Sequence, residues 1–139
     1  MAIYLRVRLT RFAVRQTILA HIAERLLSAI GESRSELSLE LIGDRRMRRL
    51  NREYRKKDRP TDVLAFSIRE AVMPKGVRPV THMLGDVVTS LPTAVRQAKE
   101  AGRSIDDELT MLLVHGVLHL CGYDHERNPR EAARMTRRE

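Results

Sequence analysis

The chain has 139 residues, of which 26 are basic and 18 acidic, so its formal net charge is +8 with histidine neutral. Hydrophobic residues make up 42% and charged residues 32%, which argues against wholesale disorder and predicts one globular domain over residues 1–139. Aromatic residues make up only 4%, which disfavours a nucleic-acid surface built from stacked rings. There is no apolar run near the roughly 20 residues of a membrane span and no signal-peptide pattern at the start, so we expect a cytoplasmic protein.

The excess positive charge is concentrated in one segment. Residues 45–59 hold nine basic residues against Glu53 and Asp58, a local net charge of +7. Arginine supplies 22 of the 26 basic residues of the chain, and its forked donors suit phosphate oxygens. The sequence therefore favours a polyanion as the partner.

The first third of the chain predicts two strands around one helix. Residues 3–7 begin with β-favouring side chains and predict a strand. Apolar side chains recur every four positions from Val14 to Ile30, which predicts an amphipathic helix that starts near Phe12 and ends before Gly31. Residues 36–42 alternate between polar and apolar, as a half-buried strand does.

A basic helix follows that second strand. Asp44 is expected to cap a helix of residues 45–54, in which Met47, Leu50 and Tyr54 face inward. Its other side is expected to be a stripe of outward-facing arginines: Arg45, Arg48, Arg49 and Arg52.

The middle of the chain predicts a small pair of strands. Residues 58–62 have turn composition, and residues 63–67 read as a short buried strand. A long loop or lid is expected over residues 68–83, because it contains two prolines and a glycine. Residues 85–90 predict another strand, a candidate antiparallel partner of 63–67, and residues 91–101 a short helix.

The last predicted helices follow. Ser104 and Asp107 resemble a capping box for a helix that runs to about Leu120, whose second half is apolar all round and should be buried centrally. A final short helix is expected from about Pro129. The order of strands and helices lacks regular alternation, so we expect an α+β fold: one sheet of about four strands, with helices packed chiefly on one face.

The chemistry is concentrated in three histidines. His115 and His119 are four residues apart on the predicted central helix, so both imidazoles project from one face and can reach one metal ion. Gly122 can end the helix in a left-handed conformation, after which the chain can return His125 as a third ligand. Three neutral imidazoles leave a coordination position open, as in catalytic zinc sites.

The same histidine spacing occurs in the metzincin zinc proteases, but one element of their pattern is missing. Gly116 stands where those enzymes carry the glutamate general base, which argues against a peptidase. Of the neighbouring residues, Asp124 can accept a hydrogen bond from a ligand or stabilise the turn, and Cys121 is expected to be a packed thiol. His82 is a spare candidate for a fourth ligand.

Three segments resemble the YbeY family of bacterial metal-dependent endoribonucleases, which act in ribosomal RNA maturation and quality control. They are HGVLHLCGYDHE at 115–126, LNREYRKKDRPTDVLAFS at 50–67 and LGDVVTS at 84–90. Ala65 and Ser67 stand where the family commonly has Ser and Pro. The resemblance extends from about residue 37 to residue 135.

The resemblance implies an α+β fold with a small mixed sheet, one zinc ion held by His115, His119 and His125, and a functionally important arginine at Arg55. It also implies a single-strand-specific endoribonuclease of small-subunit ribosomal RNA maturation, whose partners are ribosomal RNA or its precursors and ribosome-associated proteins. Zinc and the Arg55 guanidinium would together stabilise the charge that develops when a phosphodiester is cleaved. The general base stays open, as does the choice between water and the RNA 2′-hydroxyl as nucleophile.

Two other functions fit the same residues. One is a non-catalytic RNA-binding factor of ribosome assembly with a structural zinc, which would need a fourth protein ligand such as His82. The other is a metal-dependent hydrolase of a small substrate, which the basic stripe makes less attractive.

Overall fold

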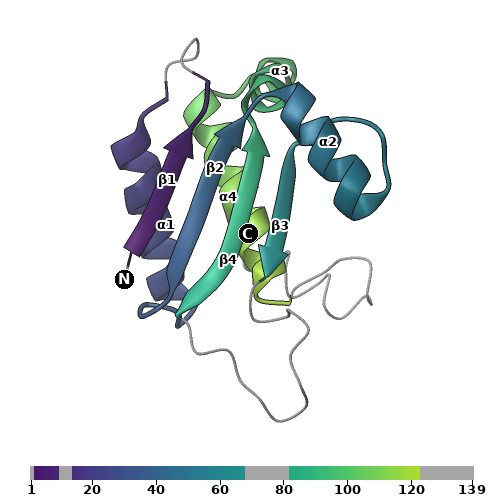
Figure 1. Ribbon diagram of the computed structural model, residues 1–139. Coiled ribbons are helices and arrows are strands. Elements are labelled where there is room, and N and C mark those ends of the chain that lie inside the picture. Colours follow the sequence, from purple (N-terminus) through teal and green to yellow (C-terminus); the bar gives the residue numbers. More distant parts are fainter. Residues whose placement is uncertain (1, 10–13, 68–81, 123–139) are drawn as a thin grey trace, which may run out of the picture.

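The computed structural model describes residues 2–9, 14–67 and 82–122 (Figure 1). Most of the expected loop or lid of residues 68–83 and the expected helix near Pro129 lie outside the described residues. None of the helices in these ranges combines the length and the apolar character that a membrane span needs.

Four strands form one mixed sheet. They are β1 (Ala2–Val7), β2 (Glu36–Ile42), β3 (Val63–Ser67) and β4 (Met83–Ser90). The order across the sheet is β1-β2-β4-β3, with β1, β2 and β4 parallel and β3 antiparallel to β4. Val63 pairs with Thr89 and Ser67 with Gly85, which confirms the predicted pairing. Within the described ranges, β3 is an edge strand.

In the part of the chain that the structure describes, four helices accompany the sheet: α1 (Gln16–Ala29), α2 (Asp44–Arg55), α3 (Leu91–Ala101) and α4 (Ile105–Leu120). The predicted start of α4 is confirmed, because the Ser104 hydroxyl accepts a hydrogen bond from the Asp107 backbone N–H at 3.1 Å. Three acidic residues in the first turn of α4 complement the positive end of the helix dipole.

The hydrophobic core lies on both faces of the sheet. Helices α1 and α4 pack on one face, where Val63 and Ala65 of β3 join the main hydrophobic cluster (Figure 1). Leu64 and Phe66 instead join a smaller cluster around Met47 of α2. Because successive side chains of a strand point to opposite faces, α2 covers the second face beside β3. The expectation of helices chiefly on one face therefore holds for α1 and α4 but not for α2.

The prediction that Tyr54 faces inward is wrong. Its side chain is 63% exposed and only its ring edge meets Phe66, with 5.1 Å between the ring centroids. Phe66 lies on the edge strand, and in the described part of the chain nothing packs beyond it to bury Tyr54.

The prediction that Asp44 caps its own helix is also wrong. Gly43 occupies the cap position of α2, and Asp44 is the first helical residue. The Asp44 carboxylate accepts hydrogen bonds from the hydroxyls of Ser90 at 2.5 Å and Thr93 at 2.6 Å, and pairs with Arg96 at 3.0 Å. Burial alone would raise the pKa of Asp44, but these three partners outweigh it and hold the pKa below its ordinary value. Asp44 therefore ties the start of α2 to the start of α3.

Candidate active site

A cavity of about 200 Å³ lies at the edge of the sheet beside β3. It is enclosed by α4, by β3 and by the end of α2 with the segment that follows it. The residues that line it are Asn51, Arg55, Lys57, Arg59, Thr61, Asp62, Val63, Leu64, Ala65, His115, Gly116 and His119. Two of the three predicted metal ligands and the predicted functional arginine therefore share one cavity.

The histidine pair lies on α4. The ring centroids of His115 and His119 are 4.9 Å apart, with 34° between the ring planes. Both histidines are half-buried and line the cavity. Helix α4 ends at Leu120, and Gly122 follows with φ of 90°, the left-handed turn that the sequence predicted. His125 and Asp124 lie outside the described residues.

Gly116 fixes how closely α4 approaches the sheet. A Cβ atom at this position would lie 2.7 Å from Cγ1 of Val87 and 3.3 Å from Cγ2 of Val63. A side chain at position 116 would therefore collide with the sheet. The position that carries a glutamate base in the proteases is here a packing contact, and its lack of a side chain lets the histidines sit directly beside β3.

The histidine pair can supply two of the ligands of a zinc site. Two imidazoles from adjacent turns of one helix border an open cavity, and neutral imidazole is a ligand that zinc accepts. In residues 2–9, 14–67 and 82–122 the pair is not joined by a third histidine, cysteine or carboxylate to form a metal-binding group. His82 is exposed and is not among the residues that line the cavity, and Cys121 packs partly buried against the main core cluster.

Seven of the nine basic residues of α2 and the following segment fall into two sets. Arg55, Lys57 and Arg59 line the cavity. The outer arginines, Arg45, Arg48, Arg49 and Arg52, are all exposed and together line a shallow depression elsewhere on α2, which confirms the predicted outward stripe.

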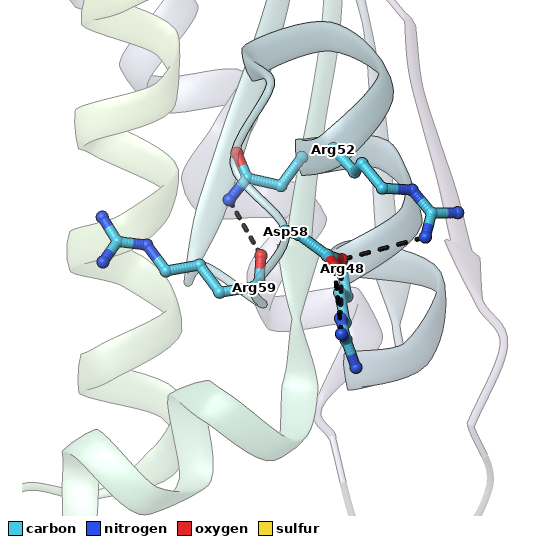
Figure 2. Close-up of polar contacts among 5 residues, drawn as sticks. Arg48, Arg52, Asp58 and Arg59 are labelled. Carbon is cyan, nitrogen blue, oxygen red and sulfur yellow. Dashed lines mark hydrogen bonds and ion pairs between the residues drawn. The ribbon is translucent and has the colours of Figure 1, made fainter.

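Asp58 neutralises part of the outer set. The Arg48 guanidinium donates to both Asp58 carboxylate oxygens, at 2.8 and 3.1 Å, and Arg52 lies 3.8 Å from the same group (Figure 2). The hydrogen bonds from Arg48 hold the pKa of Asp58 below its ordinary value. The outer arginines are therefore not four equivalent phosphate contacts.

Several residues that line the cavity carried no functional prediction, among them Asn51, Lys57, Arg59 and Asp62. Asn51 carried a signal, because it follows Met47 by four positions and so lies on the inward stripe of the predicted helix, where a polar residue needs a partner. Asp62 accepts a hydrogen bond from the Val63 backbone N–H at 2.8 Å, a turn contact of the kind that its composition predicted.

The chain is similar to a family and to a fold that are already known. The family model described as Endoribonuclease YbeY matches residues 6–139. The solution structure of a Thermotoga maritima protein aligns over 98% of this chain and 83% of its own, with a TM-score of 0.59 and 24% sequence identity, which supports the fold.

Three curated relatives share the name Endoribonuclease YbeY. That of Anaeromyxobacter sp. is 52% identical over 113 residues (81% of this chain) and that of Myxococcus xanthus 58% identical over 100 residues (72%). That of Geobacter metallireducens is 49% identical over 122 residues (87%). The aligned parts make up 55%, 33% and 79% of these relatives, so the chain spans well under two thirds of the first two. On the family match over residues 6–139 and these identities, the chain belongs to the endoribonuclease YbeY family.

Proposed function

We propose that this protein is a cytoplasmic, zinc-dependent endoribonuclease that cleaves single-stranded RNA in the maturation of small-subunit ribosomal RNA and in ribosome quality control. His115, His119 and His125 are the proposed zinc ligands, Arg55 is the proposed catalytic arginine, and residues 1–139 are proposed to act as one domain. Ribosomal RNA or its precursors are the proposed substrates, with ribosome-associated proteins as partners.

One observation carries this proposal: the cavity beside β3 is lined both by the histidine pair and by Arg55. A phosphodiester in that cavity would meet imidazoles from α4 on one side and a guanidinium from the end of α2 on the other. The name shared by the relatives supports endoribonuclease activity, and the basic segment around the cavity supports a polyanionic substrate.

The side chains that line the cavity have different proposed roles. When bound, a zinc ion supplies Lewis-acid chemistry that offsets negative charge on phosphate oxygens. The Arg55 guanidinium donates hydrogen bonds to the non-bridging oxygens, and two parallel donors fix the phosphate as well as neutralise it. The imidazoles of His115 and His119 would hold the metal, beside the wall of the cavity that β3 and α4 form.

The proposal is tested by metal content and RNA cleavage in one pair of histidine variants. His119→Ala should lose bound zinc and cleavage of single-stranded RNA together, because it removes a ligand. His21→Ala is the matched control, since His21 is an exposed residue of α1 and should leave both unchanged. Duplex RNA of the same sequence should be cleaved poorly.

Two outcomes would overturn the proposal in different ways. A wild-type protein that binds zinc and RNA but leaves RNA intact would be the RNA-binding factor with a structural zinc. Full zinc content in His119→Ala would remove the histidine pair from the metal site. Cleavage of peptides is not expected, because position 116 offers no base.

A further inference from the structure

Beside the histidine pair and Arg55, the cavity has a wall that the proposed mechanism does not use. We propose that Arg59, assisted by Lys57, forms a second phosphate-binding subsite across the cavity from His115 and His119, and that Asn51 is the positioning residue that holds it there. This inference rests on the proposed function, since the subsite would take an RNA phosphate next to the one that is cleaved.

The segment after α2 is tied back onto the helix at two points. The Asn51 side-chain N–H donates to the Arg59 backbone carbonyl at 2.9 Å, and the Lys57 backbone N–H donates to the Asn51 carbonyl at 3.3 Å. On the outer side, Asp58 is held by Arg48 (Figure 2). These contacts turn an exposed segment into a fixed wall of the cavity.

Asn51 is placed to act through this segment. Its side chain is 3% exposed, on a helix whose other residues, Met47 apart, are at least partly accessible. A buried amide needs a partner, and its donor is used on the backbone of Arg59. The chain leaves α2 through Lys56 with φ of 58°, a left-handed conformation that is costly for lysine and that this packing maintains.

Arg59 is the cation that the segment delivers. Figure 2 shows its side chain directed toward α4, away from Arg48 and Arg52, and it lines the same cavity as His115. In the described part of the chain no carboxylate pairs with its guanidinium, whereas Arg48 and Arg52 share Asp58. An unpaired guanidinium on a fixed backbone, facing a cavity that also holds Lys57, is suited to a phosphate oxygen.

The subsite is tested by the salt dependence of RNA binding, a readout that loss of stability alone does not move. A short fluorescent single-stranded RNA is titrated with the holoprotein at about 50 to 200 mM salt, and the slope of log K against log salt is measured. Arg59→Ala should flatten the slope by about 0.7, the contribution of one phosphate contact on a single strand. It should also raise Kd about tenfold at the lowest salt, the loss of one charge-assisted contact.

Asn51 is tested by its dependence on Arg59. Asn51→Leu keeps the side-chain size and the net charge but removes the donor, so it should flatten the slope by a similar amount, about 0.7. In an Arg59→Ala background, the same change should have no further effect on the slope. Arg59→Lys should keep the slope and separate charge from shape.

Ser35→Ala is the matched control for loss of a buried polar side chain. The Ser35 hydroxyl is 3% exposed and donates to Glu32, at the end of the sheet opposite Val63. It should leave the slope unchanged.

The outcomes separate this inference from the proposed function. Gels of the same samples report cleavage: RNA that is bound but uncleaved would overturn the proposed function, and the slopes would still decide the subsite. An unchanged slope in Arg59→Ala overturns the subsite whether or not the Asn51 variant folds. A slope change in Asn51→Leu that persists in the Arg59→Ala background overturns the positioning role.

Discussion

Replacing Gly116 by alanine tests whether the contact between α4 and the sheet sets the geometry of the cavity. The added Cβ would lie 2.7 Å from Cγ1 and 3.2 Å from Cγ2 of Val87, and 3.3 Å from Cγ2 of Val63. Val87 is 2% exposed and β-branched, so it cannot rotate away from the new methyl group. Helix α4 must therefore move outward.

The effect on stability follows from two opposing contributions. Overpacking a core contact costs about 1–3 kcal/mol, while alanine gains about 1 kcal/mol over glycine in a helix. The free energy of unfolding should therefore fall by about 1 kcal/mol, measured by urea denaturation. Ala20→Gly in the middle of α1 measures the helix-propensity contribution in the same chain.

The effect on activity should be larger than the effect on stability. His115 and His119 both lie on α4, so their positions relative to each other should be kept and the proposed metal ion should still bind. Their distance from Arg55 should change. A misplacement of about 1 Å can cost on the order of a hundredfold in rate. We therefore expect Gly116→Ala to retain the proposed zinc ion but to cleave RNA at least tenfold more slowly, a smaller loss than the hundredfold that a shift of about 1 Å can cause.

Val87→Ala provides the internal check on this reasoning. Removing the methyl groups that the new Cβ would meet should make the alanine at position 116 neutral or stabilising, by up to about 1 kcal/mol. If Gly116→Ala alone stabilises the protein by the full helix-propensity gain, the close contact does not exist. Unchanged cleavage in a destabilised variant would show that the approach of α4 does not set the active geometry.

Three further changes probe the charges around the site. Asp44→Asn should destabilise the protein by about 1–3 kcal/mol at neutral pH, because it removes a carboxylate that accepts two hydrogen bonds. The pKa of Asp44 is lowered on folding, so the stability difference between the wild type and the variant should be full above about pH 5. In urea melts at several pH values, this difference should begin to shrink near the unfolded aspartate pKa of about 3.9 and disappear as the pH falls through the lower pKa of the folded state. Arg45 and Arg49 pair with no carboxylate within the described residues, whereas Arg48 pairs with Asp58. Changing Arg45 and Arg49 to Gln should therefore flatten the salt slope of RNA binding by about 1.4. If this slope changes less than it does in the Arg48→Gln variant, the role assigned to Asp58 is contradicted. Arg55→Lys should keep most of the RNA affinity but lose turnover, because an ammonium cannot make the two-pronged contact; a normal kcat would remove the arginine from the catalytic groups.

Local patterns in the sequence were sufficient to predict most of the fold. The strand pairing of residues 63–67, the Ser104 cap and the left-handed Gly122 after α4 each depend on neighbours in sequence or on a period, and each is confirmed. The prediction that Tyr54 faces inward was wrong because the helical period indicates the side of α2 on which Tyr54 lies, but it does not indicate that β3 is the edge of the sheet. The prediction that Asp44 caps its own helix was wrong because the hydrogen-bond partners of Asp44, at the start of α3, lie more than 40 residues away in the sequence.

The part of the candidate site that could be predicted is the histidine pair, because both histidines lie in one short segment of the sequence. The spacing of His115 and His119 predicted their convergence, which the ring separation of 4.9 Å bears out. The opposite wall could not be predicted in this way. A run of nine cations does not reveal which of them face a cavity, because that depends on the turn at Lys56 and on the bond from Asn51 to Arg59.

The separation of these cations has an electrostatic consequence. Among the described residues that line the cavity, Arg55, Lys57 and Arg59 face only one carboxylate, that of Asp62, so the cavity is positive even before a metal ion adds its charge. Asp58 pairs instead with the outer arginines and cannot neutralise the cavity. Like charges held close together in a partly enclosed space repel, and the repulsion is relieved only by an anion. A phosphodiester chain, the proposed substrate, would supply that counter-charge at regular intervals, and its binding would relieve the repulsion. Anions that bind the folded cavity should therefore stabilise the fold itself.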